Sequence, residues 1–217
     1  MILVLAIAGI GALLVGVSLT FPTRESRVPK PETRLDEFMP VWQFSERHAI
    51  RVGAPPALVF AAIKQVRANE ISFFKTLTWI RRGGRRTSES ILNAGDGAPL
   101  LEVATRTGFM YLADQAPREL VVGTVLIAPP QADCAVTPQT FRTSLPPGYA
   151  LAAMNFLVTP DGLNGSLVST ETRVFANSPG ARRRFARYWR IIYPGSALIR
   201  RMWLRAVERR ATRSLVP

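Results

Sequence analysis

Residues 48–60 read His48-Ala-Ile-Arg-Val-Gly-Ala-Pro-Pro-Ala-Leu-Val-Phe60. Up to Val52 the side chains alternate along the chain, which predicts a strand that starts near Trp42. Pro55 and Pro56 suit the first turn of a helix, because a backbone N–H there has no intrahelical partner to lose. Apolar residues then recur at helical spacing as far as Val66. The segment therefore predicts a strand that runs directly into a helix.

The sequence that follows predicts a second helix, an antiparallel run of strands and a long final helix. The second helix covers 71–81. Residues 82–107 have no clear period: Gly95, Gly97 and Pro99 indicate a loop, and 100–105 suits one short helical turn. Strands are expected at 109–114, 119–127, 139–145, 149–158 and 166–175, with turns that contain Pro or Gly between them. Ser178 is the expected N-cap of the final helix, and Pro194-Gly195 should kink or break that helix.

This order of elements resembles the START-like (helix-grip) domains of the SRPBCC superfamily, which includes polyketide cyclase/dehydrase-like and lipid-transfer proteins. The likeness rests on residues 48–60 and on an aromatic final helix, and also on three short motifs: Arg118-Glu-Leu-Val-Val-Gly123, Ala153-Met-Asn-Phe156 and Ser169-Thr-Glu-Thr-Arg-Val174. It covers about residues 41–213. The resemblance implies an α+β domain in which a curved antiparallel sheet grips the C-terminal helix. It also implies a hydrophobic cavity between the two, and no shared catalytic residues.

The apolar strand faces leave two interpretations open, a ligand cavity or a solid core. The face over 150–158 carries small side chains at one end, and threonines recur on the neighbouring strands, so the faces permit a void with a few polar points. Together with the resemblance, these patterns give a set of candidates for the cavity wall: Phe74, Met110, Leu112, Thr124, Leu126, Ala152, Met154, Phe156, Thr170, Thr172, Phe185 and Trp189.

Residues that could carry chemistry are sparse. His48 is the only histidine and Cys134 the only cysteine, so a His- or Cys-based metal site is not expected. A catalytic triad would have to use His48, which lies beside Glu46 in the first predicted strand and is interpreted as a structural residue, so a triad is not expected either. No glycine-rich phosphate loop is present, so we expect no cofactor, no metal and no catalytic residues. Glu171 and Arg173 share one strand face. They form either a solvated or cross-strand pair, or a buried pair directed at a ligand head group.

The N-terminus predicts a membrane anchor. Residues 2–21 carry no charge, and twenty helical residues span about 30 Å, the thickness of a bilayer core. A cleaved signal peptide is the alternative, but the segment has neither a basic start nor a cleavage site. Lys and Arg follow the segment, so the rest of the chain should face the cytoplasm. A stripe of small residues, Ala8, Ala12 and Gly16, would allow two such helices to pair. We expect an anchor at 1–22, an extended linker at 23–40 and the domain at 41–217.

The charge is strongly positive, formally +13, and the final helix carries much of it. Arg182, Arg183 and Arg184 begin an arginine-rich stretch that could lie against an anionic leaflet. The alternatives are a solvated helix face or nucleic-acid binding, although no known nucleic-acid reader motif accompanies the charge. The sequence as a whole favours a membrane-tethered binder or carrier of a hydrophobic small molecule or lipid. A cyclase or dehydratase acting on a polyketide-like substrate is the second hypothesis, and a structural membrane protein the third.

Overall fold

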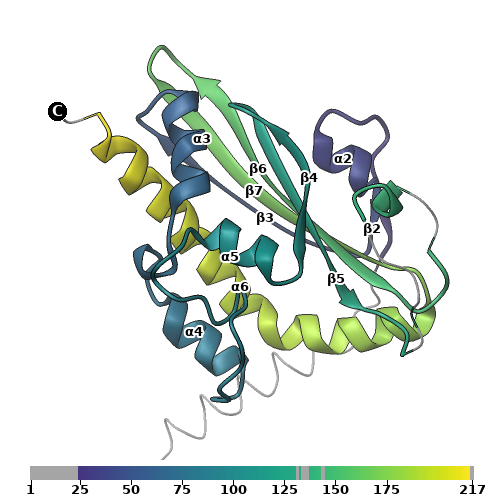
Figure 1. The fold of residues 1–217 in the computed structure, drawn as a ribbon. Coiled ribbons are helices and arrows are strands. Elements are labelled where there is room, and N and C mark those ends of the chain that lie inside the picture. Colours follow the sequence, from purple (N-terminus) through teal and green to yellow (C-terminus); the bar gives the residue numbers. More distant parts are fainter. Residues whose placement is uncertain (1–23, 131, 133–136, 143–144, 216–217) are drawn as a thin grey trace, which may run out of the picture.

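The computed structural model describes residues 24–130, 132, 137–142 and 145–215 (Figure 1). The anchor expected at 1–22 lies outside this range. Within it, no helix is both long enough and apolar enough to cross a bilayer. The chain forms a five-stranded antiparallel sheet in the order β3-β7-β6-β5-β4, together with a separate two-stranded ribbon of β1 and β2.

The segment before the sheet is folded, and the extended linker expected over 23–40 is wrong for most of its length. Strands β1 (Ser26–Arg27) and β2 (Val41–Trp42) pair, and helix α2 (Arg34–Phe38) lies between them. Thr33 caps α2, while the buried carboxylate of Glu119 accepts hydrogen bonds from the backbone of Arg34 and Leu35 at 2.7 and 3.2 Å. Leu35 is fully buried, so apolar burial holds the segment onto the sheet.

The strands largely match the sequence prediction. The sheet consists of β3 (Phe44–Val52), β4 (Phe109–Gln115), β5 (Glu119–Ile127), β6 (Ala150–Asp161) and β7 (Gly165–Ala176). The strand expected at 139–145 is wrong: Thr140–Arg142 form the 3₁₀ turn η2, which sends Phe141 into an apolar cluster on the convex face. Because β5 pairs directly with β6, no place remains between them for another strand.

The first helices follow the predicted order. Helix α3 (Pro56–Gln65) begins with Pro56 at its first position, as the Pro-Pro pair indicated. The second predicted helix is shorter than expected: a 3₁₀ turn, η1 (Ala68–Glu70), precedes α4 (Phe74–Arg81). The short helix expected near residue 100 is present as α5 (Leu100–Arg106).

The final helix, α6 (Pro179–Arg213), is capped by the Ser178 side chain. Of the two predicted outcomes at Pro194, a kink or a break, the structure shows the kink, because α6 continues through Pro194. Figure 1 shows that the helix bends near its middle, as expected for a proline that removes one backbone hydrogen bond and crowds the preceding turn.

The two faces of the sheet are covered differently. Helices α3, α5 and α6 lie on the concave side in Figure 1, and α2 covers the opposite side. A curved antiparallel sheet around a long C-terminal helix fits the helix-grip class of α+β folds. Because both faces are covered, both carry apolar side chains.

Candidate functional site

A cavity of about 250 Å³ lies between the sheet and α6. Its wall is mainly apolar and aromatic. The residues that line it are Phe74, Thr78, Arg81, Ile91, Leu92, Phe109, Thr124, Leu126, Ala152, Met154, Thr172, Val174, Phe185, Tyr188, Trp189, Ile192, Ser196, Ile199, Arg200 and Trp203. A concave apolar space with a few converging polar groups is the usual form of a small-molecule site.

The sheet register explains why the space is there. Two rows of residues that pair across the strands face the cavity: Thr124–Ala152–Val174, and Met154–Thr172 from the adjacent row. The next row along the sheet contains Leu120 and Phe156, which belong to the solid core. Smaller and polar side chains line the hollow part of the concave face, and larger apolar side chains fill the rest. The structure therefore contains both a packed core and a cavity.

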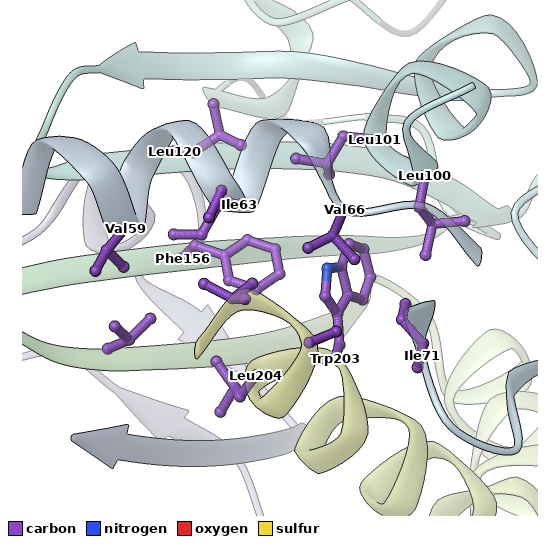
Figure 2. Close-up of a cluster of buried hydrophobic side chains, with 14 of the residues drawn as sticks. Val59, Ile63, Val66, Ile71, Leu100, Leu101, Leu120, Phe156, Trp203 and Leu204 are labelled. Atoms are coloured by element: carbon purple, nitrogen blue, oxygen red, sulfur yellow. The ribbon is translucent and has the colours of Figure 1, made fainter. Parts of the chain in front are cut away.

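The boundary between these parts is formed by Trp203. Its ring packs edge-on against Phe156, with 5.1 Å between centroids, and Figure 2 shows it among the apolar side chains supplied by α3 and α5. Trp203 also lines the cavity, so the residue closes one end of the space. Its indole N–H is buried and has no acceptor among the described residues.

The opposite part of the wall is aromatic. Phe185 of α6 packs edge-on against Phe44 of β3 at 4.9 Å between centroids, and Trp189 lies 5.7 Å from Phe185. These contacts hold the first half of α6 above the sheet. Rigid aromatic rings keep the space open with little loss of side-chain freedom on binding.

Eight of the twelve predicted wall residues line the cavity: Phe74, Thr124, Leu126, Ala152, Met154, Thr172, Phe185 and Trp189. Phe156 and Thr170 do not, because they belong to the row under Trp203; Thr170 donates to the backbone oxygen of Asn155 at 2.8 Å. Met110 and Leu112 pack in the convex-face cluster. Both were assigned to the wrong face of β4, because both faces of this strand are partly apolar, and Phe109 is the β4 residue that lines the cavity.

Polar groups on the wall are mostly satisfied by the protein. The hydroxyl of Thr124 donates to Gly108 O at 2.7 Å, and that of Thr78 donates to Phe74 O at 2.8 Å. Arg81 of α4 donates to the Tyr188 hydroxyl of α6 from two nitrogens, at 3.0 and 2.6 Å. Two wall residues, Trp203 and Arg200, have a buried N–H group without an acceptor among the described residues, and of the two only Arg200 carries a charge.

Arg200 is partly exposed as a residue, but its Nη1 atom is shielded from solvent and has no hydrogen-bond partner in the described ranges. Burial lowers the pKa of Arg200 to about 10, while the charge of Glu46 opposes this shift and that of Arg81 adds to it. The guanidinium is therefore still charged at neutral pH. The cavity wall contains a buried cation that the protein does not fully pair.

A polar chain lies behind this wall. Glu46, 4% exposed, is 2.7 Å from His48 Nε2 through one oxygen and accepts from the Ser196 hydroxyl at 2.9 Å through the other. Here the carboxylate lies between serine and histidine. In a catalytic triad the histidine lies between serine and acid, so these contacts do not activate Ser196 as a nucleophile. The expected structural role of His48 agrees with its contact to Glu46.

The Glu171–Arg173 pair combines features of both hypotheses. Arg173 is buried and donates to Glu171 at 2.6 Å and to Asp36 at 2.7 Å, and its guanidinium lies 4.0 Å from the centre of the Trp42 ring. However, these groups lie under the N-terminal segment on the convex face, away from the cavity. The pair therefore fixes that segment to the sheet and does not contact a ligand in the cavity.

The polar part of the site was not predicted. Ser196 and Arg200 are four residues apart on the α6 face toward the sheet, and this spacing was visible in the sequence. Arginines surround Arg200 on the helix, however, so composition gave no sign that this one is buried. The sequence also did not indicate that Glu46 is buried behind the wall, because Glu46 was considered only as a neighbour of His48.

The predicted membrane-surface arginines lie in the first turns of α6. Arg183 and Arg184 are exposed and Arg182 is partly exposed. No residue cluster suited to a metal ion occurs within the described ranges.

Comparison with known proteins gives little further information. No family model and no curated protein matches the chain. Among solved structures, TTHA0849 from Thermus thermophilus is 11% identical with a TM-score of 0.30, covering 79% of this chain and 99% of that one. The structure of Ara h 8.0201 is 12% identical with a TM-score of 0.25, covering 78% and 98%. Since both TM-scores lie below 0.5, the fold class rests on the topology described above.

Proposed function

We propose that this chain is a START-like binding or carrier protein for a hydrophobic small molecule or lipid. The observation that carries the proposal is the cavity of about 250 Å³ between the sheet and α6, with its largely apolar wall. An unfilled space of this size lined by aromatic rings lowers the stability of the folded chain, because the side chains around it make fewer van der Waals contacts than in a packed core. Binding of an apolar molecule restores these contacts.

We further propose that the protein works at a membrane. The uncharged segment 2–21 would anchor it as a single-pass protein facing the cytoplasm, and the start of α6 would contact an anionic leaflet. Arg184, Arg187, Tyr188 and Ile191 recur at helical spacing, and all four are exposed. A face of cations with interleaved aromatic and aliphatic side chains is typical of interfacial helices. Pairing of two anchors through the stripe of small residues remains a prediction.

A second candidate, an enzyme of cyclase or dehydratase type, is favoured by one observation. Ser196 lines the cavity and donates to the buried Glu46, so a proton-accepting carboxylate lies one residue behind the wall. The test is to recover the bound compound from wild type and from Glu46→Gln and to compare their masses. Different compounds would support an enzyme; the same compound in both supports a binder.

Two neighbouring alanines on β6 allow a matched test of the cavity. Ala152 lines the cavity, whereas Ala153 is fully buried in the convex-face cluster. We expect Ala152→Leu to weaken binding of 1-octanol by about tenfold or more, with little change in stability, because the added atoms occupy the ligand space. Ala153→Leu should leave binding unchanged and lower the free energy of unfolding by about 1–3 kcal/mol through overpacking.

Binding is measured by equilibrium dialysis of the full-length chain in a neutral detergent, against a protein-free blank. Stability is measured by urea unfolding of the same samples. If Ala152→Leu destabilises the protein as much as Ala153→Leu and leaves octanol binding intact, the space is packed core and the proposal is wrong.

A further inference from the structure

The Nη1 atom of Arg200 points to the kind of ligand that the cavity takes. This atom is shielded from solvent and has no acceptor among the residues described. Removing a charged N–H from water without a new acceptor carries the full desolvation cost of that group. Because Arg200 lines the cavity, a ligand inside it can supply the missing acceptor.

The charged groups that act on Arg200 leave its Nη1 atom without an acceptor among the described residues. The charge of Glu46 favours the guanidinium, but the two oxygens of Glu46 already contact His48 and Ser196. Arg81, which also lines the cavity, is a like charge that disfavours it. The two charged side chains on the described cavity wall, Arg81 and Arg200, are both cations. A bound anion would reduce the repulsion between them.

The geometry of the guanidinium and the size of the cavity favour one class of anion. A guanidinium presents parallel N–H groups that match the two oxygens of a carboxylate. The volume of about 250 Å³ lies just below the usual range for ligand pockets, about 300–1,000 Å³, so it suits one short chain and not a two-chain lipid. The rest of the wall, formed by residues such as Met154, Phe185 and Trp189, is apolar.

We propose that the cavity binds a single-chain amphiphile whose carboxylate pairs with Arg200 and whose hydrocarbon part lies against the apolar wall. This inference rests on the proposed function and names the chemical class of its ligand. Arg200 acts as the specificity-determining residue: it distinguishes a carboxylate from an uncharged head group on the same chain.

The test compares octanoate, 1-octanol and octyl phosphate on the full-length chain by the dialysis described above. We expect wild type to bind octanoate about tenfold more tightly than 1-octanol, and more tightly than octyl phosphate. Arg200→Met keeps the length of the side chain without the charge, and it should abolish the preference for octanoate while 1-octanol binds as before. Arg205→Met is the matched control, because Arg205 is exposed on the same helix and does not line the cavity.

Several outcomes would overturn the inference. An Arg200→Met protein that still prefers octanoate, or an equal loss in Arg205→Met, would show that Arg200 does not hold the carboxylate. Tighter binding of octyl phosphate would assign the site to phosphates. Equal binding of octanoate and 1-octanol by wild type would leave the hydrophobic carrier intact and refute only the carboxylate. Binding of none of the three would contradict both proposals. Arg200→Met should melt no lower than wild type, since it removes an incompletely paired buried charge.

Discussion

Asp36 connects the N-terminal segment to the sheet through a single carboxylate. Its oxygens accept from the backbone of Glu32 and Thr33 at 3.0 and 2.9 Å, and from Arg173 at 2.7 Å. Burial alone would raise the pKa of Asp36, but these hydrogen bonds outweigh it and hold the pKa below its ordinary value of 3.8. The charged form of Asp36 therefore stabilises the folded state.

We expect Asp36→Asn to lower the free energy of unfolding by about 3 kcal/mol at neutral pH, because it leaves the buried Arg173 with less of its negative partner. A lowered pKa means that this contribution is complete above the unfolded pKa and is lost as pH falls through the folded pKa. The difference in the free energy of unfolding between wild type and Asp36→Asn should accordingly become smaller below about pH 4. Urea titrations at pH 7 and pH 3 check this. An equal difference in the free energy of unfolding at both pH values would contradict the stabilising role of the charged Asp36.

Also at the residue scale, the sequence predicted the cavity wall where one face of a strand was distinct from the other. On β6 the alternation placed Ala152 and Met154 correctly. On β4 it placed Met110 and Leu112 on the wrong face, because α2 and η2 cover the convex side and make both faces apolar. Arg200 could not have been predicted, since its burial depends on the packing of α6.

At the scale of elements, the N-terminal segment differs most from its prediction. Its prolines and mixed charge are typical of a linker, and the sequence gives no helical period long enough to indicate α2. What fixes α2 is distant in sequence: the carboxylate of Glu119 at its N-terminus and the apolar cluster beneath Leu35. The long elements β6, β7 and α6 were predicted well because their periods extend over many residues.

We expect Leu35→Ala to lower the free energy of unfolding by about 3 kcal/mol, because it empties a fully buried position. Leu163, which is fully exposed in the turn between β6 and β7, is the control, and Leu163→Ala should change stability by less than about 0.5 kcal/mol. Urea unfolding measures both. If Leu35→Ala changes the free energy of unfolding as little as Leu163→Ala does, residues 26–40 form a loose tether.

For the whole molecule, we propose an anchored chain whose domain contacts the leaflet. The first turn of α6 has no acidic residue, and Arg182, Arg183 and Arg184 occupy the fourth to sixth positions of the helix, although the helix dipole favours anions at that end. Helix stability therefore does not explain Arg182, Arg183 and Arg184, and the proposed contact with acidic lipid would.

A chain that starts at residue 24 should cosediment with vesicles that contain acidic lipid, and less so as salt is added. Changing Arg182, Arg183 and Arg184 to Gln should reduce binding markedly. Equal binding to neutral vesicles would indicate apolar insertion, and no binding to either kind would make these arginines an ordinary solvated helix face.

We propose that the space between the sheet and α6 is a ligand site, and native mass spectrometry of the full-length protein tests this proposal. With octanoate at a concentration that saturates wild type only slightly, wild type and Ala153→Leu should show equal adducts of one molecule per chain, and the adduct of Ala152→Leu should be about tenfold weaker or absent. An adduct of equal intensity in all three proteins, or in none, would contradict the proposal.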